Sequence, residues 1–433
     1  MKLNLVDRLF VLLCGAAVLL MIPQLFHGAQ GTAPAILGIR FEFILFGLTL
    51  LGVALYHHRT LAVALTGLAS ITIYKLTVIG FDIVLHVQHE ASILINLFGL
   101  LLGFAILAKH FEESHIPDLL PSWLPSGWVG GFVLLWLVWI MSAFLDNIAA
   151  AMIGGTIALV VFKKKVHIGY LAAIVAASNA GGAGSVVGDT TTTMMWIDGV
   201  SAFDVMPAFF PAAVALMAFG VFASKQQFGY QPIVPSDTTG IKINWIKILV
   251  VAMILAGAIS TNVLLDFPAA GVWIAIVTGA LFCKTEWREV NHAIKGTVFL
   301  LSLVLCASMM PVDELPPASW QSAFALGFIS SIFDNIPLTK LALQQGGYDW
   351  GVLAYTVGFG GSMVWFGSSA GVAISNIFPE AKSVGLWLKH GWHIIIAYVI
   401  GFFAMLWIMG WEPHEHHKPT DANKEHSQLI MQK

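Results

Sequence analysis

Length and composition place this chain in a lipid bilayer rather than among soluble globular proteins. It has 433 residues, of which 58% are hydrophobic and 10% charged, and its mean hydropathy is +0.83. The net charge of −3 carries little information, because what matters in a membrane protein is where the charges lie, and we expect the lipid bilayer but no nucleic acid as a partner. Cys14, Cys283 and Cys306 lie in apolar runs without CxxC spacing, which indicates neither a zinc site nor a disulfide framework, and we expect no cofactor.

The first part of the chain contains apolar segments long enough to span a membrane. About 20 helical residues, at about 1.5 Å each, cross the roughly 30 Å hydrocarbon core of a bilayer. The first segment follows Lys2 and Arg8, as in a signal peptide, but no clear cleavage site follows Gln30, so we expect it to be retained. The predicted helices lie near 9–27, 36–56, 61–86 and 91–108.

The next apolar segment, 128–162, is interrupted at Asp146-Asn147 and followed by three lysines, 163–165. Short loops rich in Lys and Arg stay in the cytoplasm. If the N-terminus is cytoplasmic, a simple span here would place these lysines on the outer side. We therefore predict a re-entrant hairpin that enters and leaves from the cytoplasm and turns at Asp146.

A second interrupted segment, 318–345, turns at Asp334-Asn335. The charge pattern predicts that this hairpin is entered from the outer side. The polar, His-rich tail, with His414, His416 and His417, then lies outside, and its histidines are solubilising residues rather than a metal site. The other predicted spans lie near 168–198, 207–223, 244–264, 268–283, 296–311, 351–377 and 392–411.

The two interrupted segments belong to an internal repeat. Ser142-Ala-Phe-Leu-Asp146-Asn147 matches Ser330-Ser-Ile-Phe-Asp334-Asn335, and a glycine-rich break follows each, at 178–193 and 358–371. Aligning the Gly-Gly pairs of the two breaks places Asp189 opposite Ser368. Two hairpins entered from opposite sides, each followed by an interrupted span, form an inverted repeat.

The repeat predicts an all-α polytopic membrane protein with two re-entrant hairpins and two interrupted transmembrane helices. Unpaired backbone groups at membrane depth are tolerated only where they line a cavity or are buried in protein, so the four breaks should meet at a substrate site. Glycines that merely allow close helix packing are the alternative, but they explain neither the acids nor the repetition. The predicted divisions are 1–120, N-terminal helices that are mainly scaffold; 121–225, first repeat core; 226–311, linking scaffold helices; 312–412, second repeat core; and 413–433, polar tail.

Three acids, Asp146, Asp189 and Asp334, lie in apolar surroundings, where an ionised carboxylate costs at least a few kcal/mol unless it is paired or hydrated. Carboxylate, hydroxyl, amide and carbonyl oxygens together are the ligands that a hard cation prefers. We therefore expect Na⁺ or Li⁺, bound as a metal ion by Asp146 and Asp189. The candidate cation- and proton-binding residues are Asp146, Asn147, Asn179, Asp189, Thr191, Thr192, Asp334, Asn335, Ser368 and Ser369.

Burial disfavours the ionised form of these acids, so a proton competes with the cation for the same oxygens. This competition predicts exchange of Na⁺ or Li⁺ for H⁺ by alternating access. The alternative is that Asp146 and Asp334 are only N-caps of the helices that follow them. The two roles can coexist.

Other polar residues are candidates for accessory roles. Lys75 and Asp82 are seven residues apart and predict a structural ion pair, with a proton path as the alternative. Lys340, six residues after Asp334, is a candidate to neutralise that acid or to stand in for a cation.

His86, His89 and Glu90 lie at the outer end of the predicted helix 61–86. Because histidine titrates near neutral pH, the cluster predicts a pH-sensing mouth. A solvated interface without such a role is the alternative.

The motifs Asn179-Ala-Gly-Gly and Gly188-Asp189-Thr-Thr-Thr-Thr-Met-Met-Trp196-Ile, with the two Asp-Asn turns, carry a family resemblance. Over roughly 80–410 the chain resembles the NhaD-type bacterial sodium/proton antiporters of the ion transporter superfamily. It departs from them at Gly184 and Val186, where members tend to carry Trp and Pro, and in lacking an acid a helix-length ahead of Asp146.

The resemblance implies a dimeric protein with a scaffold and a mobile transport domain. It implies a multi-pass protein of the bacterial inner membrane, with its N-terminus cytoplasmic and its C-terminus periplasmic by the charge pattern. The important polar positions that it implies are Glu90, Asp146, Asn147, Asn179, Asp189, Thr191, Thr192, Ser330, Asn335 and Ser368.

Three other classes remain as alternatives. A citrate or dicarboxylate transporter of the same superfamily would have hairpin turns that resemble Ser-Asn-Thr, whereas the Asp-Asn turns found here favour cations. An intramembrane aspartyl protease has a Gly-x-Gly-Asp signature, but Val187-Gly188-Asp189 lacks its first glycine, and we do not expect an enzyme. A non-transporting scaffold would not need buried acids.

Overall fold

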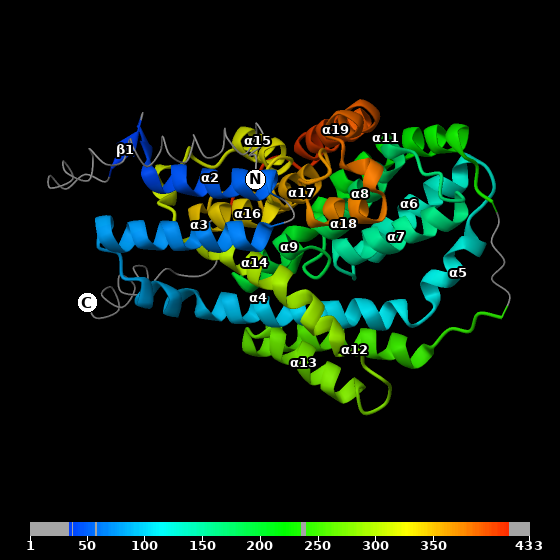
Figure 1. The fold of residues 1–433 in the computed structure, drawn as a ribbon, viewed down its shortest axis with the longest axis horizontal. Coiled ribbons are helices and arrows are strands. Elements are labelled where there is room, and N and C mark those ends of the chain that lie inside the picture. Colours follow the sequence, from blue (N-terminus) through cyan, green and yellow to red (C-terminus); the bar gives the residue numbers. More distant parts are fainter. Residues whose placement is uncertain (1–33, 37, 57–58, 235–239, 415–433) are drawn as a thin grey trace, which may run out of the picture.

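The structure is a computed structural model that describes residues 34–36, 38–56, 59–234 and 240–414 (Figure 1). Over these residues the protein is almost entirely helical, and six of its helices are long and apolar enough to cross a membrane. The chain is therefore an all-α polytopic membrane protein. The predicted helix near 9–27, His416 and His417 lie outside the described residues.

The elements follow one another along the chain with short connections. The N-terminal part contains an antiparallel pair of short strands, β1 (Ala35–Ile36) and β2 (Ile39–Arg40), then α2 (Phe41–Leu55), α3 (Thr60–Tyr74), the π-helical turn η2 (Lys75–Ile79), α4 (Ile83–Glu112) and α5 (Ile116–Trp123). The first repeat segment contains α6 (Trp128–Ser142), α7 (Asn147–Val161), α8 (Ile168–Ala183) and α9 (Thr190–Ile197). The central part contains α10 (Ala202–Val205), η3 (Met206–Ala208), α11 (Phe209–Tyr230), α12 (Trp245–Leu265), α13 (Pro268–Gly279), α14 (Arg288–Ser308) and η4 (Val312–Glu314). The second repeat segment contains α15 (Trp320–Ser330), α16 (Asn335–Gln345), α17 (Trp350–Gly360) and α18 (Ser369–Ile377), and η5 (Pro379–Lys382) and α19 (Val384–Ile408) follow.

The helices form two packed groups. The long helix α4 packs against α12, α13 and α14 along one side of the molecule (Figure 1). In the other group, α11 packs against α6, α8 and α19, and α17 packs against α15 and α8. The interrupted helices lie at the centre of this second group, because Gly169 to Ala183 of α8 and all of α17 are buried. A helix that is apolar all round is expected in such a place.

Small residues allow this centre to close. A Cβ atom on Gly181 of α8 would overlap the carbonyl oxygen of Trp139 in α6, and a Cβ on Gly360 of α17 would overlap that of Gly327 in α15. Each interrupted helix therefore approaches the first helix of its own hairpin closely, at the same point in both repeat segments.

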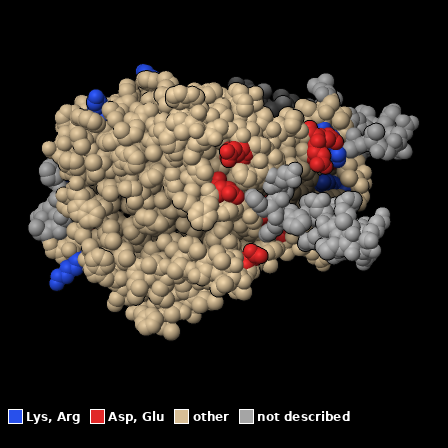
Figure 2. Space-filling view, turned by 180° about the vertical axis from the view of Figure 1, so that it is seen from behind, with Lys and Arg blue, Asp and Glu red and all other residues tan. Residues whose placement is uncertain are grey.

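The outer surface is apolar. Leu264, Leu281 and Trp407 are each at least three-quarters exposed. Most of the face in Figure 2 carries no charged side chain, and the Lys and Arg residues visible there lie near its edges. Such a surface fits a hydrocarbon environment better than water.

One predicted helix boundary, between 61–86 and 91–108, is wrong. The chain breaks earlier, at Gly80, which adopts a left-handed φ of 71° at the end of η2. Asp82 then caps α4 by accepting hydrogen bonds from the N–H groups of Val84 and Leu85, both at 3.0 Å. His86, His89 and Glu90 consequently lie in the first turns of α4, at the N-terminal end of that helix rather than at the end of the helix before it.

The predicted Lys75–Asp82 ion pair is also not formed. The ammonium group of Lys75 donates to the carbonyl oxygen of Met309 and lies 4.2 Å from the ring centroid of Phe81. The Asp82 carboxylate caps α4 instead. The change of direction at Gly80 makes the seven-residue spacing a poor guide to proximity.

Candidate cation-binding site

The four predicted breaks are present and come together. Asp146 and Asp334 lie at the turns α6–α7 and α15–α16, and Asp189 and Ser368 begin α9 and α18. The two repeat segments cross each other at this point, because α7 packs against α18 and α9 packs against α16. The site is therefore built from both segments.

A hydrogen-bonded network joins the segments at the centre of the site. The Asn147 amide donates to the carboxylate of Asp189 (2.9 Å) and to the amide oxygen of Asn179 (3.1 Å). The Asn179 amide in turn donates to the hydroxyl groups of Ser362 (3.0 Å) and Ser368 (3.1 Å). These side chains are all buried, so the network fixes their positions.

The threonines after Asp189 have two different roles. Thr191 donates to the Asp189 carboxylate from its backbone N–H and from its hydroxyl group, each at 2.8 Å. The Thr192 hydroxyl donates to the carbonyl oxygens of Ser185 (2.5 Å) and Asp189 (2.9 Å). Thr192, a predicted ligand, therefore holds the backbone of the break and does not contact the carboxylate.

Asp146 is placed differently from the other acids. Its side chain forms no cap hydrogen bond with α7, and its buried Oδ1 atom has no hydrogen-bond partner among the described residues. The backbone N–H groups of Asn147 and Ile148, at the start of α7, still interact with this carboxylate. Asp146 is therefore a buried acid with one oxygen that lacks a hydrogen bond of standard geometry.

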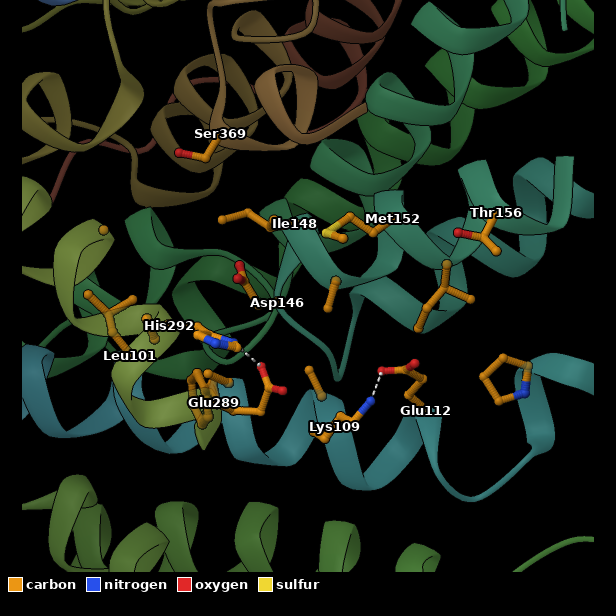
Figure 3. A pocket seen from close by; sticks show the side chains of 18 of the residues that line it. Leu101, Lys109, Glu112, Asp146, Ile148, Met152, Thr156, Glu289, His292 and Ser369 are labelled. Atoms are coloured by element: carbon orange, nitrogen blue, oxygen red, sulfur yellow. Dashed lines mark hydrogen bonds and ion pairs between the residues drawn. The ribbon is translucent and has the colours of Figure 1, made fainter. Parts of the chain in front are cut away.

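A cavity of about 810 Å³ leads to Asp146. Figure 3 shows Asp146 between side chains of α4, α7, α14 and α18. The lining of the cavity is mainly apolar. Its charged residues include Lys109, which pairs with Glu112 at 2.9 Å, and Glu289, which lies 3.6 Å from His292.

A second, smaller cavity of about 180 Å³ is lined by Asp334, Ser368 and Ser369. Ser369 lines the large cavity as well, so it lies between the two acids of the hairpin turns. Asp334 does cap its helix, because its Oδ1 accepts a hydrogen bond from the N–H of Ile336 at 3.0 Å. Asn335 follows it as the first residue of α16 and is buried.

The site carries negative charge without a protein counter-charge. Among the described residues, none of Asp146, Asp189 and Asp334 forms an ion pair with Lys, Arg or His. A buried carboxylate without a counter-ion is strongly unfavourable, so a cation or a proton is needed when the site is closed to water.

The accessory residues lie elsewhere. Lys340 pairs with Glu90 on α4 at 2.9 Å, so the prediction that it neutralises Asp334 is wrong. His86 contacts the hydroxyl group of Ser308 at 2.8 Å. His89 lies on α4 next to Glu90.

Two serines hold the hairpins against the interrupted helices. Ser330 donates from its hydroxyl group to the carbonyl oxygen of Val357 (2.7 Å), and Ser142 donates in the same way to that of Ser178 (2.6 Å). Ser142 and Ser362 are not among the predicted site residues. The repeat could have identified Ser142 as the counterpart of Ser330, and Ser362 follows directly after a Gly-Gly pair.

No protein-family model matches this chain, but curated relatives do. Sodium/proton antiporter 1 of Arabidopsis thaliana is 27% identical over 348 residues, which are 68% of this chain and 58% of that protein. This chain thus spans less than two thirds of the Arabidopsis relative. The Na⁺/H⁺ antiporters NhaD of Vibrio cholerae (24% identical, 71% of this chain and 77% of the relative) and of Alkalimonas amylolytica (26%, 74% and 80%) are matched over more of their length. These relatives are named as antiporters, which are transporters and not enzymes. By these matches the chain is a relative of the NhaD-type sodium/proton antiporters.

Proposed function

We propose that this chain exchanges Na⁺ or Li⁺ for H⁺ across the bacterial inner membrane by alternating access. Asp146 and Asp189 are shared in turn by the cation and the proton. The observation that carries the proposal is the carboxylate of Asp146, a residue that lines the cavity, has a buried oxygen without a hydrogen-bond partner among the described residues, and lies next to the Asn147–Asp189–Asn179 network.

The chemistry of the site supports a small hard cation. Asp146 and Ser369 line the large cavity, and Asp189 and Asn179 belong to the adjoining hydrogen-bonded network, so the site offers carboxylate, hydroxyl and amide oxygens, the ligands that sodium prefers. The charges of Asp146 and Asp189 repel each other, so binding one positive charge relieves the repulsion. A proton on either acid does the same and excludes the cation.

The direction of the cavity supports an inward-open state. Its charged end includes Lys109 and Glu289, which neighbours Arg288, and the charge pattern assigns these loops to the cytoplasm. In this orientation the N-terminus is cytoplasmic and the C-terminus periplasmic. Asp146 is then reached from the cytoplasm, and the two hairpins are re-entrant from opposite sides.

The packing supports a division into a scaffold and a transport core. The helices α4, α12, α13 and α14 form the scaffold group, while the cross-packed pairs α7–α18 and α9–α16 hold the two repeat segments together as one body. We propose that this body moves against the scaffold within a homodimer. The divisions at 121–225 and 312–412 contain the moving segments.

Proton flux in everted membrane vesicles tests the proposal. We expect Na⁺ or Li⁺ to dissipate a preformed proton gradient, and Asp146→Asn and Asp189→Asn to abolish the response, because an amide cannot carry the exchanged proton. Glu286→Gln is the matched control, since Glu286 is a carboxylate of the α13–α14 loop that pairs with Lys284 outside the cavity. No response to either ion at neutral and alkaline pH, with the protein present in the membrane, would contradict the proposal.

A carboxylate substrate is the main rival and needs a direct test. The unpaired acids would repel citrate or succinate. Cation-dependent uptake of either labelled anion into proteoliposomes would replace the proposed exchange with anion transport.

A further inference from the structure

A buried ion pair joins the two helix groups away from the cation site. The Lys340 ammonium on α16 lies 2.9 Å from a carboxylate oxygen of Glu90 on α4, and the two side chains are 3% and 5% exposed. That oxygen, Oε2, accepts no hydrogen bond of good geometry from a described residue. The contact is therefore an electrostatic attraction without a well-directed hydrogen bond. Separating an ion pair this deeply buried costs much free energy, because each charge would be left without water or a partner.

The ion pair is part of a larger set of contacts among α4, α14, α16 and η2, which we call the joint. Ser308, at the end of α14, contacts His86 of α4 through its hydroxyl group (2.8 Å) and accepts a hydrogen bond from Gln344 of α16 at its carbonyl oxygen (2.9 Å). Lys75 donates to the carbonyl oxygen of the next residue, Met309. The free carbonyl groups at the end of α14 are thus satisfied by donors from α16 and from η2.

Glu90 supplies the negative charge that faces Lys340 in the joint. The charged and titratable groups that act on His86 are Lys75, His89, Glu90 and Lys340, and Glu90 is the only acid among them. The acid that acts on Lys75 is Glu42. Neutralising Glu90 would leave the buried ammonium group of Lys340 without its partner.

Lys340 belongs to the hairpin that carries Asp334 and Asn335. It lies six residues after Asp334, or about 9 Å along a helix axis. The same helix, α16, packs against α9, which begins at Asp189, and against α14 of the scaffold. A shift of α16 along α4 would therefore move the ion pair and the site together.

We propose that Glu90 and Lys340 position the second hairpin against α4 and thereby set the rate of transport without binding the transported ion. This inference rests on the proposed cation/proton exchange. In alternating access the core moves past the scaffold, and the ion pair stabilises one position of α16 relative to α4. The residues act on the site only through α16, so ion affinity is preserved.

Sodium-driven proton flux in everted vesicles, measured over a range of Na⁺ concentrations, tests the proposal. We expect Glu90→Gln and Lys340→Met to lower the maximal rate about tenfold while the half-saturating Na⁺ concentration stays within about twofold. The charge-swapped double variant, Glu90→Lys with Lys340→Glu, restores the attraction and should regain most of the lost rate. Glu113→Gln is the control, because it breaks the Lys247–Glu113 pair (2.7 Å) between α4 and α12, within the scaffold group, and should leave the rate within about twofold.

Each outcome decides the matter. Single variants with the wild-type rate, a change in half-saturating Na⁺ as large as the change in rate, or a swapped variant no faster than the single ones would overturn the proposal. If the single variants are not recovered folded, as judged by size-exclusion chromatography, the swapped variant decides alone: folded and fast supports the ion pair, and unfolded or slow refutes it. A wild-type chain without cation-driven flux defeats the proposed exchange and this inference with it, whereas a normal wild type with unaffected variants defeats this inference alone.

Discussion

The turns of the two hairpins share the residues Asp-Asn, yet their carboxylates are placed differently. Asp334 uses an oxygen to cap α16 through the N–H of Ile336, whereas Asp146 makes no cap bond and leaves Oδ1 without a partner among the described residues. The matching positions in the breaks also differ, with Asp189 in the first and Ser368 in the second. The comparison shows that a repeated backbone can place the matching carboxylates of its two halves in different hydrogen-bonding surroundings.

The backbone frame itself is the same in both halves. Ser142 and Ser330 make the same hydrogen bond from the hairpin to the interrupted helix, and Gly181 and Gly360 make the same close approach. The asymmetry begins at the side chains next to the breaks. Asn179, which bonds to Asn147, Ser362 and Ser368, has a glycine, Gly358, as its counterpart.

The largest expected difference between the halves is the response to Asp→Asn at the two turns. Asp146→Asn should reduce exchange at least about a hundredfold, equal to about 2.7 kcal/mol of transition-state stabilisation, because an amide cannot alternate between cation and proton. Asp334→Asn should reduce it less than about tenfold, because asparagine caps a helix about as well as aspartate. Cation-driven proton flux in vesicles with matched protein amounts measures both. Equal losses would show that the two turns are functionally equivalent and would end the comparison.

The sequence predicted the features that occur in both repeat segments. Hydropathy located most of the helices, and the two Asp-Asn turns with their glycine-rich breaks predicted that residues of both halves meet, as they do in the candidate site. The Asp-Asn turns that the two segments share could not show that Asp334 makes a cap hydrogen bond of standard geometry and Asp146 does not. That difference arises from three-dimensional packing around each turn.

Two other failures have physical causes that sequence patterns do not carry. The break at Gly80 lies between apolar residues on both sides, so hydropathy does not detect it. The partner of Lys340 is Glu90, which is distant in sequence and belongs to another helix group, whereas proximity along the chain favoured Asp334. Spacing arguments hold within one helix and fail where the chain turns.

Gly181 and Gly360 allow the close helix contacts that the two repeat segments share. Gly181→Ala and Gly360→Ala each place a methyl group against a backbone carbonyl oxygen, so each should destabilise the protein by about 1–3 kcal/mol, the usual cost of overpacking. The melting temperature in detergent and the yield of monodisperse protein measure the effect. Gly385→Ala, in α19, is the control, because nothing lies within 4 Å of its Cβ position. A normal melting temperature for either variant would show that the two approaches are not equally tight.

The smallest expected effect comes from the paired serines. Ser142→Ala and Ser330→Ala each remove one buried hydrogen bond to the interrupted helix, which should cost about 1 kcal/mol of stability. The half-saturating Na⁺ concentration should not change, because neither hydroxyl group contacts the acids. Thermal melting of the single and double variants measures the loss, and the two losses should add within about 0.5 kcal/mol because the sites share no partner.

The chain itself supplies the control for this last comparison. Ser331, next to Ser330, bonds only to the carbonyl oxygen of Phe328 in its own helix, and its counterpart in the first half is already alanine, Ala143. Ser331→Ala should therefore be nearly neutral. If Ser142→Ala destabilises the protein or alters its Na⁺ dependence and Ser330→Ala does not, the hydrogen bond from hairpin to interrupted helix matters only in the half that contains Asp146. The two halves would then differ in their backbone support as well as in their side chains.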